Sequence, residues 1–124
     1  MSYDMKQLNT QFFMEQSNLD TARNSLLTAL IGRIRFQPQL VRTLEDAISQ
    51  FSWNSWNLKF DEHGNVNGIK LVIEKAGEDN CMFNAIAPYV KAGSYIRMEG
   101  EGGALWQWVF DGKCCTIKQP TISW

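Results

Sequence analysis

The C-terminal part of the chain consists of short aromatic and β-branched runs, each bounded by glycine. The runs are residues 94–99, 105–110 and 113–117. Glycine reaches positive φ without steric cost, so the glycines at 100–103 and the Asp111-Gly112 pair can form hairpin turns. Residues 94–117 are therefore predicted to form a three-stranded antiparallel meander.

The middle run of the meander is aromatic on one side. With a period of two, Trp106, Trp108 and Phe110 share one face of the strand. At roughly 25 cal/mol per Å² of buried apolar area, three such rings contribute several kcal/mol together. We expect this face to pack against helices from the rest of the chain.

Two amphipathic helices are predicted before the meander. In residues 19–34 apolar side chains recur at three- and four-residue spacing, with Ser17, Asn18 and Asp20 as candidate caps and Gly32 near the end. A second apolar stripe extends from Pro38, which suits the first turn of a helix, to residue 51. The two stripes must pack on each other or on a sheet.

The remaining segments are shorter. In residues 1–16 the spacing of Met5, Leu8 and Phe12 favours a helix, although residues 11–14 also suit an extended strand. Residues 56–60 and 69–74 alternate and predict a hairpin with a solvated tip at 61–68. A short helix follows, with Met82 and Phe83 on one face, and Pro88 limits it.

These elements predict one α+β domain over residues 1–124. We expect N-terminal helices packed on a four- or five-stranded antiparallel sheet, in the order helices, hairpin, short helix and three-stranded meander. A chain of 124 residues with 44% apolar content can bury one substantial core.

Charge and composition argue against several classes of function. The net charge is −1 and there is no basic stripe, so we expect no direct nucleic-acid binding. No apolar run approaches a membrane span, and three cysteines do not make a disulfide framework. We therefore expect a cytoplasmic protein without a membrane contact or a cofactor.

Few residues suggest metal or cysteine chemistry. His63 is the single histidine and lies beside Asp61 and Glu62, a pattern typical of a solvated turn more than of a metal site. Alternation sends Cys114 and Cys115 to opposite faces, where we expect inert, partly buried thiols. A Cys-His dyad with His63 stays open, because the sequence does not place these groups relative to one another.

Glu99 and Glu101 bracket Gly100 at a predicted turn. Two close carboxylates can act as acid and base, but catalysis requires one of them to be desolvated. A glycine-rich turn projects both into water, so a solvated acidic tip is the favoured interpretation.

Five tryptophans in 124 residues exceed what core filling usually needs. Trp53, Trp56 and Trp124 lie at segment edges, where an indole can be half exposed and anchor a partner protein. Trp106 and Trp108 are favoured as core residues.

The meander carries a resemblance. Residues 94–103, Ser-Tyr-Ile-Arg-Met-Glu-Gly-Glu-Gly-Gly, followed by 105–112, Leu-Trp-Gln-Trp-Val-Phe-Asp-Gly, resemble a hairpin pattern of small uncharacterised bacterial α+β proteins. Some of these are similar to immunity or antitoxin partners. The likeness covers about a quarter of the chain and concerns a structural hairpin. It implies a small inhibitory binding protein, and no catalytic residue can be carried over from it.

The leading hypothesis is a non-enzymatic inhibitor that blocks another protein, such as a toxin, a nuclease or a subunit of a host defence complex. It would act as an immunity protein, an antitoxin or a phage-type inhibitor. The predicted contact residues are acidic groups in loops, with one tryptophan as anchor: Asp61, Glu62, Glu78, Asp79, Glu99, Glu101, and Trp53 or Trp56.

Three alternatives stay open. The aromatic sheet face can serve as a stacking platform for a small ligand. An enzyme would use Glu99 and Glu101 or a cysteine. A homodimer can form through an edge strand such as residues 56–60.

Overall fold

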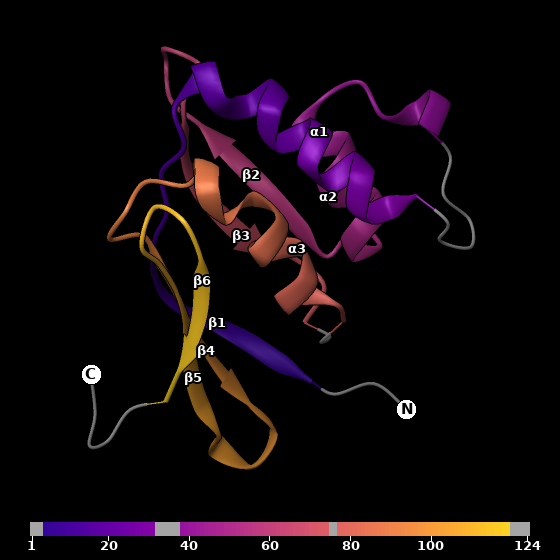
Figure 1. Cartoon of the computed structure of the whole chain (residues 1–124). Helices are drawn as coiled ribbons and strands as arrows, with labels where there is room; N and C mark the ends of the chain where they lie inside the picture. Colours follow the sequence, from indigo (N-terminus) through magenta and orange to yellow (C-terminus); the bar gives the residue numbers. More distant parts are fainter. Residues whose placement is uncertain (1–3, 32–37, 75–76, 120–124) are drawn as a thin grey trace.

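The computed structural model describes residues 4–31, 38–74 and 77–119. Over these residues, three α-helices accompany a four-stranded antiparallel sheet, in the order β1-β4-β5-β6, and a two-stranded sheet of β2 and β3 (Figure 1). The strands are β1 (Met5–Gln11), β2 (Trp56–Phe60), β3 (Val66–Leu71), β4 (Tyr95–Gly100), β5 (Leu105–Phe110) and β6 (Cys115–Lys118). The α+β prediction is confirmed, with the strands divided between two sheets.

The predicted meander is present as β4, β5 and β6. Gly102 and Gly103 in the β4–β5 turn and Gly112 in the β5–β6 turn have positive φ, which explains why glycine is needed there. Asp111 completes the second turn by accepting two backbone N–H groups. The N–H groups of Cys114 and then of its neighbour at 113 lower the pKa of Asp111.

The first two helices differ in how well their ends were predicted. Helix α1 (Leu19–Leu30) buries Ala22, Leu26 and Leu30 on the predicted stripe. It ends earlier than predicted, because the backbone of Ile31 is not helical, and residues 32–34 lie outside the described residues. Helix α2 (Leu44–Ser52) begins later than predicted, because Pro38–Leu40 forms a separate 3₁₀ turn.

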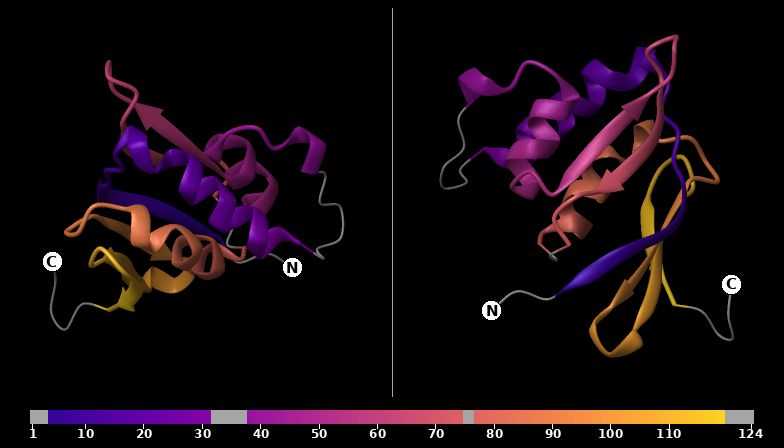
Figure 2. Two further views of the ribbon diagram at one scale, coloured as in Figure 1. Left: turned by 45° about the horizontal axis from the view of Figure 1, so that its top comes forward. Right: turned by 180° about the vertical axis from the view of Figure 1, so that it is seen from behind.

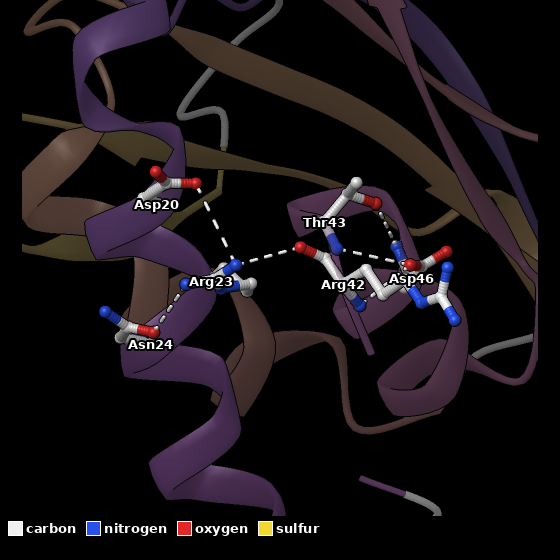
Figure 3. A network of polar contacts seen from close by, with 6 residues as sticks. All are labelled: Asp20, Arg23, Asn24, Arg42, Thr43 and Asp46. Carbon is white, nitrogen blue, oxygen red and sulfur yellow. Dashed lines mark hydrogen bonds and ion pairs between the residues drawn. The ribbon is translucent and has the colours of Figure 1, made fainter. Parts of the chain in front are cut away.

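The start of α2 is held by a capping box and by a link to α1 (Figure 3). Thr43 Oγ1 accepts the Asp46 N–H at 3.2 Å, and Asp46 Oδ2 accepts the Thr43 N–H at 3.2 Å. The Arg42 N–H also donates to Asp46 Oδ2, at 2.9 Å. From α1, Arg23 Nη1 donates to the Arg42 carbonyl at 2.8 Å. These bonds determine where α2 starts and tie it to α1.

The prediction of an N-terminal helix is wrong, because residues 5–11 form β1 and pair with β4. A bulge interrupts the pairing between Gln7 and Thr10. There the Gln7 side chain binds the other sheet: Nε2 donates to the Ile69 carbonyl at 2.8 Å, and Oε1 accepts the Leu71 N–H at 2.9 Å. The N-terminal segment therefore joins the two sheets.

The helices lie on one face of the β2–β3 hairpin (Figures 1 and 2). Helix α3 (Asp79–Ile86) buries Met82, Phe83 and Ile86, as the pattern predicts. The Phe83 ring lies 5.2 Å from Trp56 and 4.8 Å from Trp108, centroid to centroid. The aromatic face of β5 thus packs against α3. None of the helices in the described part of the chain has the length and apolar character needed to cross a membrane.

Candidate functional site

Two of the predicted contact residues, Trp56 and Asp79, are buried against each other. Trp56 is 1% exposed and Asp79 is 6% exposed. Trp56 Nε1 donates to Asp79 Oδ1 at 2.8 Å, and Asp79 Oδ2 accepts the Gly77 N–H at 2.9 Å. β2 turns Trp56 toward the core, so Trp56 is not the exposed anchor that the sequence predicted. Asp79 is buried with it and is not an exposed acidic group.

Asn80 makes a similar contact with β5. Its Oδ1 accepts a hydrogen bond from Trp108 Nε1 at 2.7 Å, so the start of α3 binds two indole N–H groups. Trp108 and Phe110 are buried, whereas Trp106 is partly exposed and meets the Trp108 ring at 88°. The aromatic face is therefore covered by α3 along most of β5 and accessible near Trp106.

A cavity of about 360 Å³ lies at the accessible end of the aromatic face, near Trp106. We call it the indole cavity. Its walls include Trp106 and Trp108 from β5, Ile117 from β6, and Asp79 and Asn80 from α3. Ile117 pairs with Trp108 in the sheet and yet is 47% exposed. The residues that line the cavity thus include aromatic and aliphatic side chains, an aspartate and an asparagine.

An open groove of about 520 Å³ lies beside the start of β1 and the end of β4. Four acidic residues, Asp4, Glu74, Glu99 and Glu101, line it together with Lys6, and we call it the acidic groove. Lys6 Nζ lies 3.2 Å from Glu99 Oε1, and Glu101 Oε1 accepts the Asp4 N–H at 3.0 Å. Among the described residues that line the groove, four carry a carboxylate and one carries an ammonium, so the acidic groups outnumber the basic one.

The groove contains two residues that sequence reasoning missed. Asp4 is brought to Glu101 by the pairing of β1 with β4. Glu74 is brought there because its carbonyl accepts the Met5 N–H at 3.2 Å. Both contacts join segments far apart in the sequence, and no local pattern signals them.

Exposed apolar side chains lead up to the acidic groove. Trp53, the C-cap of α2 in the turn that leads to β2, is 62% exposed. The Ser55 carbonyl accepts the N–H groups of Val72 and Ile73, which are also exposed, and the chain then continues to Glu74. We call Trp53, Val72 and Ile73 the apolar edge. Trp124, also predicted to be an edge tryptophan, lies outside the described residues.

The predicted acidic residues do not form one surface. Asp61 and Glu62 occupy the β2–β3 turn, at the opposite end of the molecule from the β4–β5 turn with Glu101 (Figures 1 and 2). Glu78 is exposed directly before α3. A partner that covers the acidic groove would thus leave the β2–β3 turn outside its main contact.

Asp61 has a local role in the β2–β3 turn. Its Oδ1 accepts the N–H groups of His63 and Asn65, and its Oδ2 accepts the Asn65 side-chain amide. Desolvation acts to raise the pKa of Asp61, but the hydrogen bonds from Asn65 and His63 outweigh it and lower the pKa. His63 Nε2 lies 3.5 Å from the exposed Glu62 carboxylate. Glu62 and His63 are exposed, as predicted, but the predicted tip at 61–68 is too long, because β3 begins at Val66 and Val66 is buried.

The three cysteines are free thiols. Cys115 is half-buried on the core side beside Phe110, and burial, with a contribution from Asp111, raises its pKa to about 12. Cys114 and Cys81 are exposed, so the prediction of a partly buried thiol holds for Cys115 and is wrong for Cys114.

Within residues 4–31, 38–74 and 77–119, no group of three or more His, Cys, Asp or Glu side chains is arranged to hold a metal ion. Comparison with protein-family models, curated proteins and solved structures gives no match. The resemblance to immunity and antitoxin partners therefore stays a prediction.

Proposed function

We propose that this chain is a non-enzymatic binding protein that blocks a partner protein, as an immunity protein, an antitoxin or a phage-type inhibitor of host defence does. The partner is a toxin, a nuclease or a defence-complex subunit with a basic surface. The observation that carries the proposal is the acidic groove, together with the exposed apolar side chains of Val72 and Ile73 in the segment that leads to Glu74 and of Trp53 near Ser55, which binds that segment.

Each part of this surface has a distinct role in binding. The carboxylates of Glu74, Glu99 and Glu101 attract a basic surface and accelerate encounter, and they disfavour acidic partners. The exposed indole of Trp53 supplies apolar area of the kind that dominates interface energetics. The proposed contact surface comprises these groups and leaves out the β2–β3 turn with Asp61 and Glu62.

Charge reversal with a matched control tests the proposal. Two tagged double variants are recovered from the native cells. The groove pair combines Glu74→Lys with Glu101→Lys, and the control pair combines Glu15→Lys with Glu62→Lys. All four glutamates are exposed, and both pairs change the net charge equally. We expect the groove pair to bind the stoichiometric partner at least about tenfold more weakly, a loss of about 1.4 kcal/mol of binding free energy. The control pair should bind it as the wild-type chain does.

Two further measurements complete the test. The recovered partner should lose its own activity when the wild-type chain is added and keep that activity when the groove pair is added. If both charge-reversed pairs bind equally well, the surface assignment is wrong. If no stoichiometric partner is recovered with the wild-type chain, the proposed function is wrong.

A second function, from a different class, is supported by the indole cavity. Its volume of about 360 Å³ falls within the range of small-molecule sites, and Trp106 offers a ring for stacking. A sugar or nucleotide that binds there should change the tryptophan fluorescence of the wild-type chain and have less effect on a Trp106→Leu variant. Fluorescence that is constant across a panel of both ligand classes would exclude this function.

A further inference from the structure

We propose that the indole cavity binds a cationic group, a guanidinium or an ammonium. The partner protein supplies it as an arginine or lysine side chain that anchors the complex. The identity of the supplier rests on the proposed function. The chemistry of the cavity rests on the residues that line it.

The first observation is a buried carboxylate whose hydrogen-bond partners are neutral. Asp79 is 6% exposed, and its oxygens accept N–H groups from Trp56 and Gly77. No ion pair joins Asp79 to a lysine or arginine within the described residues. A buried charge normally has a counter-ion. A carboxylate accepts about four hydrogen bonds, so acceptor capacity is left for a cation.

The second observation is the arrangement of the rings beside this carboxylate. Trp106 and Trp108 lie 5.9 Å apart, centroid to centroid, at 88° to each other, and both line the cavity. Indole is the best aromatic partner for a cation, and a planar guanidinium also stacks on it. Ile117 supplies an apolar wall for the aliphatic stem of an arginine or lysine. Carboxylate and aromatic walls together favour a cation over a neutral group.

The third observation is that the indole cavity and the acidic groove are neighbours. Met5 lines both, and its N–H binds the carbonyl of Glu74 in the groove. A basic protein surface that meets the groove carboxylates therefore brings its side chains to the mouth of the cavity. This charge complementarity favours a basic protein as the supplier of the cation.

A titration of the purified chain tests the chemistry without a partner. The probes are Nα-acetyl-arginine methylamide and the nearly isosteric, neutral Nα-acetyl-citrulline methylamide, added to ¹⁵N-labelled protein. We expect the arginine probe to shift the indole N–H resonances of Trp56, Trp106 and Trp108 saturably, with about tenfold weaker binding of the citrulline probe. Equal binding of both probes, or no shift with arginine, would overturn the proposal.

Variants assign the effect to the cavity. Asp79→Asn keeps an oxygen acceptor for the Trp56 indole while removing the charge, and should abolish the preference for arginine over citrulline. Trp106→Leu should weaken arginine binding severalfold. The matched control, Trp53→Leu, alters an exposed tryptophan outside the cavity and should leave binding unchanged. A preference that survives Asp79→Asn would overturn the proposal.

One comparison identifies the supplier of the cation. Free arginine that binds at least tenfold more tightly than the capped probe would indicate a metabolite and would overturn the assignment to a partner.

Failure of the cavity assignment and failure of the proposed function give different results. If arginine binds as expected and no partner is recovered, the cavity assignment stands and the proposed function fails. If a recovered partner binds Asp79→Asn and Trp106→Leu as well as wild type, the anchor is wrong and the proposed function stands.

Discussion

Replacing Asp79 by alanine should destabilise the protein by about 3 kcal/mol. The substitution removes the acceptor of the buried Trp56 indole N–H at 2.8 Å and the acceptor of the Gly77 N–H at 2.9 Å. A hydrogen bond to a charged group contributes about 1.5–3 kcal/mol, and an ordinary one about 1 kcal/mol. The bond to the buried Trp56 indole is assigned about 2 kcal/mol and the bond to the exposed Gly77 N–H about 1 kcal/mol, which together give about 3 kcal/mol.

A double-mutant cycle separates this interaction from the other effects of each substitution. Trp56→Phe removes the indole N–H and also leaves a cavity beside Phe83, so its total cost includes lost packing. The cycle of Asp79→Ala and Trp56→Phe removes these separate terms. We expect a coupling energy of about 2 kcal/mol, within the range for directly bonded residues.

Urea unfolding followed by far-ultraviolet circular dichroism is the suitable assay, because removing a tryptophan alters the fluorescence signal. Trp53→Phe is the control: Trp53 is exposed, so its cycle with Asp79→Ala should couple by less than about 0.5 kcal/mol. A Trp56–Asp79 coupling as small as this control would refute the conclusion that the buried hydrogen bond stabilises the fold.

Three further predictions concern single groups. Thr43→Ala should cost about 1 kcal/mol in urea unfolding, because it removes the N-cap of α2, and an unchanged midpoint would contradict the capping role. The Arg42 N–H, opposed by desolvation and aided by Thr43, lowers the pKa of Asp46 below its ordinary 3.8. The stability that the ionised Asp46 carboxylate contributes is therefore fully present above pH 3.8 and is lost as the pH falls through the lower pKa of the folded state. The difference in free energy of unfolding between wild type and Asp46→Asn should shrink in acid. At pH 8, Ellman's reagent should modify two thiols in the native protein and the third, Cys115, only after unfolding, because burial raises its pKa to about 12; rapid modification of all three would contradict this.

Much of the secondary structure follows from local patterns. The spacing of apolar residues identifies α1 and α3, and the glycines with positive φ mark the turns between β4, β5 and β6. These signals are local because helix and hairpin periodicities involve residues close together in the chain. The start of α2 was missed, since its capping box at Thr43 outweighs the helix-start signal of Pro38.

The first strand could not be predicted by the same means. The spacing of Met5, Leu8 and Phe12 suits a helix, but long-range partners select the extended form. These partners are β4 on one side and the β3 backbone, which binds the Gln7 side chain, on the other. Tertiary hydrogen bonds therefore override the local preference.

In the candidate site too, local sequence patterns leave open what long-range contacts decide. From the sequence alone, Trp53 and Trp56 look equivalent, as do Glu78 and Asp79, because each pair lies at the edge of a segment. The tertiary structure separates them, since the pleat of β2 and the docking of α3 bury Trp56 and Asp79 together.

The sequence by itself determined the α+β class, the helical stripes of α1 and α3 and the meander, because these depend on short-range periodicity and turn chemistry. Only the tertiary structure decided that β1 joins two sheets, that the acidic groove gathers Asp4 and Glu74 beside Glu99 and Glu101, and that two indoles and a carboxylate meet at the indole cavity. Those features depend on contacts between residues far apart in the chain, and no local spacing encodes them.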